Sequence, residues 1–502
     1  MIPKYKRFPH GYEFSNFQGQ PEGKTIRIVP ASVTIPLRQG FGDEVVPLVE
    51  PGQKVTAGQI IGRDDESVSS PVHSSVNGTV TAIETIDHLG RETTAVVIES
   101  DGDRNWQSLD GFSANYENLP AKKIGELIYL SGVGSSGKSG IPTGFNSSVI
   151  PPQEVTNVIV QGIGSQVHNI SLDVLLKDDG HLDKDDGLHH FIEGVKILKK
   201  LMSGAQFQLA FNKSDKALIE KISLLLGDND WVTVQPVTSK YPVHRDEVLT
   251  PLLTGIEFPY GYSAANVGVI VLDIQSVLHV YDAVVKGKPL IERTIALCGP
   301  GFKENLHVKA SIGSPIEHIV ADNLVTDGIY RFVSNNCLTG ASISDLSLPV
   351  DRTFEIVVTL LEADKSEFLA FARPGFKNDS YSRTCISMLT KNNKSLQKKC
   401  GTNVHGELRP CISCTFCEEV CPTGIIPHLL FHYVERDMID ENLLKYKIHN
   451  CIECNLCSYV CPSKIPIAQF IKEGKAGLVK EGFESPEPNI ELKGAEKYKS
   501  IT

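Results

Sequence analysis

The sequence predicts a multidomain α/β protein, and three observations carry this prediction. Its 502 residues exceed one ordinary domain, since domains usually hold roughly 100–200 residues. Short β-branched stretches bounded by Gly and Pro alternate with stretches of helical periodicity. Eight of the 12 cysteines lie between Cys411 and Cys461. We therefore expect three or four domains, the last of which is rich in cysteine.

Composition and charge narrow the class of protein. Apolar residues make up 41% and charged residues 22% of the chain, which is typical of globular proteins. With 49 basic and 60 acidic residues the net charge is −11, so we expect no nucleic-acid partner. The first residues contain no secretory signal. The longest apolar stretch, 267–272, is far shorter than the ~20 residues that span a bilayer. We expect a protein that is soluble or at most peripheral to a membrane.

Residues 1–110 are predicted to contain a small β domain. Turn pairs such as Pro51-Gly52 and Asn77-Gly78 punctuate its β-branched stretches. Segments 55–62 and 71–80 resemble the two halves of a biotinyl/lipoyl-type barrel. A carrier domain would present a modified lysine between these halves, but residues 63–68 contain none. We therefore expect a barrel-sandwich domain that serves in docking.

Residues 132–139 match the P-loop pattern G-x4-G-K-[ST]. A phosphate-binding P-loop must follow a buried strand and open a helix. Residues 121–130 suit a helix as well as a strand, and 140–144 are a poor helix start. The pattern therefore does not favour nucleotide hydrolysis, although a glycine loop opposite a flat or anionic cofactor stays open.

The middle of the chain predicts an α/β domain followed by a second β module. Runs 155–160 and 267–273 suit buried strands, and 191–202 and 218–226 have helical spacing. We assign 111–288 to an α/β nucleotide-binding-like domain, an argument from fold alone. Residues 289–395 form a β module with a connecting strip. The scattered cysteines are interpreted as buried small apolar residues: Cys298, Cys337, Cys385 and Cys400.

Two cysteine runs carry the strongest chemical signal. Both 411–422 and 451–462 read C-x2-C-x2-C-x3-C-P, the bacterial ferredoxin run for a [4Fe–4S] cube. Three closely spaced thiolates can cover one face of a cube, and the last cysteine of each run ligates the other cluster. The first predicted ligand set is Cys411, Cys414, Cys417 and Cys461. The second is Cys451, Cys454, Cys457 and Cys421.

Structural zinc is the alternative for these cysteines, but zinc does not require a duplicated three-cysteine loop followed by Cys-Pro. The stretch between the runs has helical spacing over 425–438, with Pro427 in its first turn. Asp440 suits the N-cap of a second helix over 441–447. We expect a helical ferredoxin domain over 400–480 and a tail over 481–502. The nearby histidines are interpreted as solvated or core residues: His428, His432 and His449.

Several segments, taken in order, resemble the C subunit of Rnf-type ion-translocating ferredoxin:NAD oxidoreductases. They are the barrel segment 70–80, the glycine loop 132–144, the stretch 284–316 and the double cysteine cassette. Segment 366–387 is more similar to the A subunit of sodium-translocating NADH:quinone reductases. The resemblance implies a central domain like the flavin subunit of complex I and a β-grasp module after residue 289.

The same resemblance implies an FMN or NADH pocket, but three of its motifs differ here. The family carries GGAGFPT-, ECEPY- and YPQGGEK-like segments where this chain has 136–143, 161–166 and 241–247. FMN is therefore an open cofactor, whereas two [4Fe–4S] clusters are expected. Cations around a glycine loop would suit a phosphate or a quinone oxygen. The candidate pocket residues are Gly132, Gly134, Gly137, Lys138, His244 and Arg245.

The functional prediction is an electron-transfer subunit of a membrane-associated NADH, ferredoxin or quinone oxidoreductase complex, which we expect to translocate ions. Its partners would be the membrane subunits of an Rnf- or NADH:quinone-reductase-like complex, at the cytoplasmic face of the inner membrane. NADH, ferredoxin and quinone are the candidate redox partners, and the sequence identifies no catalytic residue. The alternative is an iron–sulfur scaffold or assembly protein with a vestigial flavin pocket.

Overall fold

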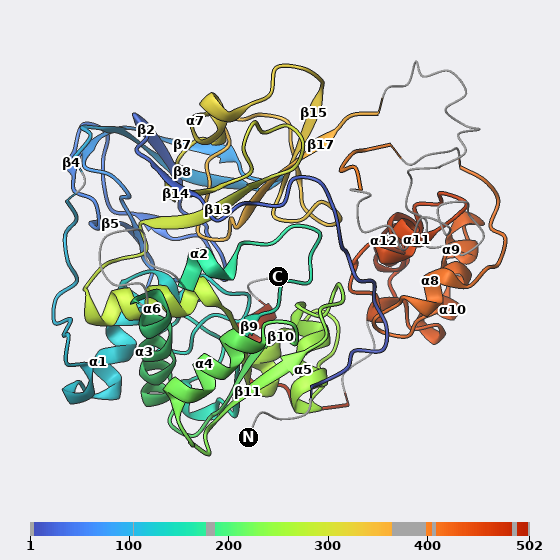
Figure 1. Ribbon diagram of the computed structural model, residues 1–502, viewed down its shortest axis with the longest axis horizontal. Helices are drawn as coiled ribbons and strands as arrows, with labels where there is room; N and C mark the ends of the chain where they lie inside the picture. Colours follow the sequence, from blue (N-terminus) through green and yellow to red (C-terminus); the bar gives the residue numbers. More distant parts are fainter. Residues whose placement is uncertain are drawn as a thin grey trace.

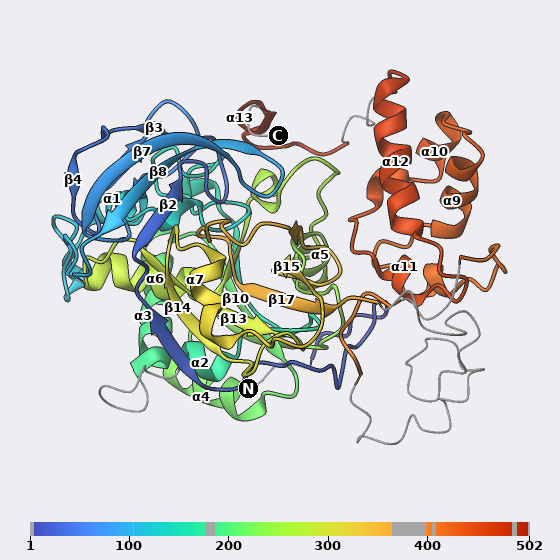
Figure 2. The same cartoon turned by 90° about the horizontal axis from the view of Figure 1, so that it is seen from above.

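The computed structural model describes residues 5–103, 105–176, 186–363, 398–403, 408–483 and 489–499. Three sheet-containing regions lie together in one body, and the helices of the cysteine-rich domain stand to one side of it (Figure 1 and Figure 2). Among the described helices, none is long and apolar enough to cross a membrane.

Two small antiparallel sheets form the N-terminal β domain. One has the strand order β2-β8-β7-β4 and the other the order β3-β5-β6. Asn77, from the predicted turn, accepts a hydrogen bond of 2.8 Å from the backbone N–H of Ala57. The strands are β2 Ser32–Pro36, β3 Val46–Pro47, β4 Lys54–Val55, β5 Ile60–Arg63, β6 Val72–His73, β7 Gly78–Asp87 and β8 Glu92–Ser100.

A parallel sheet with the order β11-β10-β9-β12 forms the α/β region. Its strands are β9 Asn157–Gly162, β10 Gln206–Asn212, β11 Val232–Val237 and β12 Val269–Asp273. The apolar runs predicted as buried strands are confirmed in β9 and β12. Because β10 and β12 lie on opposite sides of β9, the strand order reverses at β9. In open parallel sheets, ligands bind where the strand order reverses, just beyond the carboxyl ends of the strands.

Helices cover this sheet and confirm the helical spacing of the sequence. Residues 121–130, which suited either state, form helix α1 because their apolar side chains face one buried side. The helices are α1 Ala121–Leu130, α2 Leu172–Leu176, α3 Asp186–Leu201, α4 Lys216–Leu226, α5 Asp246–Thr254 and α6 Ile274–Val285.

The third sheet has six strands in the order β1-β14-β13-β17-β15-β16. Its edge strand β1 comes from the N-terminal region and pairs in parallel with β14. The predicted connecting strip lies largely outside the described residues, as does Cys385. The elements are β1 Thr25–Ile28, β13 Glu292–Cys298, β14 His307–Ser311, α7 Ile316–Val320, β15 Tyr330–Ser334, β16 Ser342–Ile343 and β17 Ile356–Leu361.

The cysteine-rich region is helical, as predicted. Pro427 occupies the first turn of its helix, and Asp440 caps the next helix by accepting from the Asn442 N–H at 2.9 Å. Past this region, the Lys493 N–H donates to the Asn266 carbonyl of the α/β region at 2.9 Å. The helices of the cysteine-rich region are α8 Phe416–Glu419, α9 Pro427–Glu435, α10 Glu441–Lys445, α11 Leu456–Val460 and α12 Ile467–Lys480. The tail contains α13 Ala495–Lys499.

Candidate functional site

The two cysteine loops repeat the same backbone conformation. Ser413 and Thr415 have φ values of 51° and 60°, and the matching Glu453 and Asn455 have 56° and 66°. Left-handed residues in tight loops turn backbone N–H groups into a concavity that suits an anion. The N–H of Glu453 lies 3.4 Å from the sulfur of Cys451. Each loop is thus shaped to surround a group that carries negatively charged sulfur.

One cavity brings cysteines of both runs together. Cys421 of the first run lines it with three cysteines of the second run, Cys451, Cys454 and Cys457. Ile425, Ala468 and Ile471 contribute apolar walls. This grouping is the one that the crossed ligand assignment requires for the second cube.

Cys417 and Cys461 are buried in the same core, and Cys411 packs against it. Burial raises the pKa of Cys417 to about 11, and the charges of Cys414 and Cys461 act in the same direction. The His428 Nδ1 atom lies 3.9 Å from the Cys417 sulfur. Of the three histidines interpreted as solvated or core residues, His428 therefore has a thiol partner, which its sequence position did not predict.

The donor set fits iron–sulfur cubes. Burial also raises the pKa of Cys454 to about 12, so bound metal would be needed to hold these sulfurs as thiolates. The four cysteines around the cavity match the one thiolate that each iron of a cube takes, and the other four cysteines of the runs would supply the thiolates of a second cube. Within the described ranges, no three His, Cys, Asp or Glu side chains could hold a single metal ion together.

The cysteine-rich region contacts the α/β region through Tyr241. Its hydroxyl donates a hydrogen bond of 2.8 Å to the carbonyl of Cys454. Nearby, the Asn455 side chain donates to the carbonyl of Leu338 at 2.9 Å. Tyr12, Phe14 and Tyr459 pack around this contact. Tyr241 belongs to the segment that differs from the family motif, but no sequence pattern indicated its contact with the cysteine loop.

The glycine-rich loop does not have the surroundings of a P-loop. It follows a helix, α1, and its residues 133–135 form a single 3-10 turn after Gly132. The buried guanidinium of Arg352 donates to the carbonyl of Gly132 at 2.5 Å and to Ser135 Oγ at 2.7 Å. A carbonyl directed at a cation is the opposite of the N–H donors that hold phosphate. The structure thus argues against nucleotide hydrolysis.

Lys138, His244 and Arg245 lie close enough to influence one another, but they do not form three free cations. Burial lowers the pKa of His244 to about 3, with contributions from Arg245 and Lys138. Its ring is therefore neutral, and Nδ1 lies 2.7 Å from Ser165 Oγ. The prediction of a cation at His244 is wrong because burial disfavours the charged ring. Arg245 forms a two-bond ion pair with Glu247, at 3.0 and 3.1 Å.

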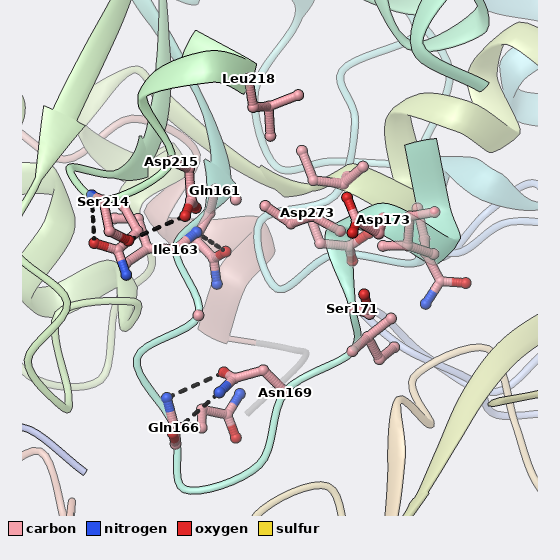
Figure 3. A pocket seen from close by; sticks show the side chains of 18 of the residues that line it. Gln161, Ile163, Gln166, Asn169, Ser171, Asp173, Ser214, Asp215, Leu218 and Asp273 are labelled. Carbon is pink, nitrogen blue, oxygen red and sulfur yellow. Dashed lines mark hydrogen bonds between the residues drawn. The ribbon is translucent and has the colours of Figure 1, made fainter. Parts of the chain in front are cut away.

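A cavity of about 520 Å³ lies instead at the carboxyl ends of the parallel strands, where Figure 3 shows its lining. Gln161, Asn212 and Asp273 mark the ends of β9, β10 and β12. None of the six predicted pocket residues, all of them within the described ranges, lines this cavity. Segment 161–166, which replaces a family motif, contributes five lining residues: Gln161, Gly162, Ile163, Gly164 and Gln166.

Two family models match the chain. The RnfC barrel sandwich hybrid domain matches residues 6–103, and a 4Fe-4S dicluster domain matches residues 407–465. The resemblance to RnfC proteins is confirmed. The dicluster domain accounts for two [4Fe–4S] clusters and decides against the zinc alternative for this RnfC-like chain.

A curated relative covers more of the RnfC-like chain. It is the C subunit of the ion-translocating oxidoreductase complex of Pseudomonas aeruginosa, 28% identical over 448 residues. The match includes 88% of this chain but 52% of that protein, so the chain spans about half the length of its relative.

Solved structures match more weakly. An NAD+-reducing [NiFe]-hydrogenase in the air-oxidised state has a TM-score of 0.40 and 10% identity, covering 79% of this chain and 72% of that one. The H2-reduced state has a TM-score of 0.32 and 10% identity, covering 51% and 52%.

Proposed function

We propose that the chain is the electron-transferring RnfC-type component of an ion-translocating oxidoreductase complex, and that its two [4Fe–4S] clusters accept and release single electrons. The observation that carries the proposal is the cavity lined by Cys421 together with Cys451, Cys454 and Cys457. The ligand sets are the crossed ones: Cys411, Cys414, Cys417 and Cys461 for one cluster, and Cys451, Cys454, Cys457 and Cys421 for the other.

The two cluster sites have different surroundings, which supports an electron path that enters at one cluster and leaves at the other. Tyr241 of the α/β region contacts the loop of Cys454. At the first run, Leu408 just before it and Ile412 within it are 66% and 67% exposed. Exposed apolar side chains beside a redox site suit a protein partner. We therefore infer that the second-run site faces the α/β region and the first-run site faces a partner.

The strand-end cavity is the proposed site for an organic redox carrier. A volume of about 520 Å³ lies within the range of small-molecule pockets, and the place agrees with the rule for reversed strand order. NADH, FMN and quinone are the candidate carriers. The glycine-loop residues Gly132, Gly134 and Gly137 then support the fold and do not contact the carrier. Lys138 belongs to the same loop, and His244 and Arg245 directly precede α5.

The proposed setting is a complex with membrane subunits, the chain being peripheral at the cytoplasmic face of the inner membrane. The curated relative is named as a subunit of an ion-translocating oxidoreductase complex. We also propose that 289–363 is a β-grasp module, which is supported by a β14-β13-β17-β15 order with parallel central strands.

Paired cysteine substitutions test the cluster sites. Protein prepared without oxygen should hold about eight irons. With crossed ligands, Cys421→Ser/Cys454→Ser removes ligands of one cluster and should leave about four irons. Cys411→Ser/Cys421→Ser removes ligands of both clusters and should leave almost none. If each run held its own cluster, Cys411→Ser/Cys421→Ser would instead leave about four irons and Cys421→Ser/Cys454→Ser almost none. Cys337→Ser, outside the runs, is the control and should keep all the iron.

A reductive titration followed by EPR separates the relay from the scaffold alternative. The relay requires that NADH, reduced ferredoxin or a quinol reduces the clusters in the assembled complex. Clusters that only a strong artificial reductant such as dithionite can reduce would favour a scaffold.

A further inference from the structure

Two carboxylates share one guanidinium beside the strand-end cavity. The Nη2 atom of Arg293 lies 3.3 Å from Asp273 Oδ2 and 3.3 Å from Glu355 Oε1. The Arg293 side chain is only 2% exposed, and its Nε donates to the Phe354 carbonyl at 3.0 Å. Both carboxylates line the cavity. A single cation cannot fully compensate two neighbouring carboxylates, so one of them is favoured to hold a proton.

Hydrogen bonds decide which carboxylate is ionised. Asp273 caps helix α6 and accepts from the Ser276 N–H at 2.6 Å and from Ser276 Oγ at 3.1 Å. Although burial opposes it, Arg293 and Ser276 hold the pKa of Asp273 below its ordinary value. Within the described residues, the Glu355 carboxylate accepts a side-chain hydrogen bond from Arg293 alone. Burial, followed by the charge of Asp273, raises the pKa of Glu355 to about 7. Of the two carboxylates, Glu355 is therefore the one that is favoured to hold the proton.

Charged groups from several elements surround this carboxyl. Arg293 of β13 and Asp273 of β12 are its direct neighbours, and Lys138 of the glycine loop also acts on it. Asp351 acts on Arg293 from the segment before β17. The remaining charged residues of the cavity are Asp173, Asp215 and Lys216.

The lining indicates an uncharged ligand. Besides the proton-bearing Glu355, three carboxylates and a single lysine line the described cavity, namely Asp173, Asp215, Asp273 and Lys216. A phosphate would meet net repulsion from these carboxylates. The apolar side chains are Ile163, Ile170, Leu172, Leu175, Leu218, Ile274 and Ile356. Apolar walls with a few polar groups suit a planar ring.

We propose that Glu355 is the proton-bearing hydrogen-bond donor of this cavity, and that it binds a carbonyl oxygen of an uncharged redox ring, a quinone head group or a flavin ring. The inference rests on the proposed function, in which the cavity serves an organic redox carrier. A protonated carboxyl can donate to a carbonyl, whereas a carboxylate can only accept. Affinity should therefore fall as the pH rises past the point at which Glu355 ionises.

The test is calorimetric binding of riboflavin and of ubiquinone-1 to the iron-loaded full chain. The compound that resembles the natural carrier, riboflavin or ubiquinone-1, should bind more weakly as the pH rises. Its Kd should increase about 30-fold between pH 6 and pH 8.5, in proportion to the loss of protonated Glu355. Glu355→Gln keeps an N–H donor but cannot ionise, so its Kd should change less than about twofold. Glu317→Gln, an exposed matched control on α7, should keep the wild-type pH dependence. FMN should bind more weakly than riboflavin.

Proton uptake gives a measurement that needs no variant. At pH 8, binding to the wild-type chain should take up about one proton per ligand, measured in buffers of different ionisation enthalpy. Equal pH dependence in wild type and Glu355→Gln, no proton uptake, or no binding of either ring would overturn the inference. Iron content and cluster EPR of the same samples test the proposed function separately.

Discussion

The guanidinium of Arg352 donates a hydrogen bond of 2.5 Å to the carbonyl oxygen of Gly132. It also reaches Ser135 Oγ, Gln39 Oε1 and the Pro71 carbonyl. One buried side chain from the segment before β17 thus joins the glycine loop to the barrel domain. The loop that matches a P-loop in sequence therefore has a structural role, because it connects two regions of the fold through Arg352.

Replacing Arg352 should therefore weaken the fold. Arg352→Met leaves buried carbonyl acceptors without a donor, and each such group costs about 1–3 kcal/mol. We expect the free energy of unfolding to fall by about 2–4 kcal/mol, measured by urea denaturation. Arg331→Met, which removes an exposed pair with Glu362, should change it by less than about 1 kcal/mol. Equal effects of the two substitutions would contradict the role given to Arg352.

ATP should not bind to the glycine loop. The Gly132 carbonyl faces Arg352. The N–H groups of Gly132, Val133 and Ser136 already donate to Tyr129, Ser131 and Val133, so they are not available as the row of donors that phosphate needs. Calorimetry with ATP and Mg²⁺ should show no binding at millimolar ligand. Binding that Lys138→Ala abolishes would restore the P-loop interpretation.

Tyr241 should stabilise the contact between the α/β and cysteine-rich regions. Tyr241→Phe removes the hydroxyl that donates to the Cys454 carbonyl, at a cost of about 1 kcal/mol. Hydrogen exchange should become faster in residues 451–457, with full iron content. Tyr330→Phe removes an exposed hydroxyl donor and should leave exchange in those residues unchanged. Unaltered exchange in Tyr241→Phe would contradict the contact.

Lys475 should raise the reduction potential of the adjacent cluster. This buried amine donates to the Cys451 carbonyl at 2.7 Å and pairs with Glu453 at 2.9 Å. A positive charge near a cluster favours its reduced, more negative state. Lys475→Met should therefore lower one of the two potentials by tens of millivolts in an EPR-monitored titration. Lys472→Met on the same helix is the control, and equal potentials in both variants would refute the effect.

Buried histidines should make stability depend on acid pH. Burial lowers the pKa of His73 and His244 to about 3 and that of His279 to about 4, against about 6.5 when unfolded. Between pH 4.5 and 6 the unfolded chain binds more protons at these sites, so stability falls as pH falls. Asp246 and Glu355 act in the opposite direction, because their pKa values are raised to about 6 and about 7.

A single histidine variant isolates this effect. As the pH falls from 6 to 4.5, the free energy of unfolding of His73→Asn should decrease by about 1.4 kcal/mol per pH unit less than that of the wild type. Urea denaturation at several pH values measures this difference. His189→Asn, at an exposed position of α3, is the control and should leave the pH dependence as in wild type. An unchanged slope in His73→Asn would show that His73 is not held neutral in the folded chain.

The sequence determined what depends on local spacing. The paired cysteine runs predicted the clusters because ligand spacing along a loop is itself the signal. Helical periodicity and the Asp440 cap predicted α9 and α10, since those interactions span only a few residues.

Tertiary structure decided what depends on residues distant in the chain. The pairing of β1 with β14, the contact of Arg352 with Gly132 and the triad of Asp273, Arg293 and Glu355 each join residues that no local pattern links. The neutral state of His244 also required the fold, because burial, which sequence spacing does not report, disfavours the charged ring.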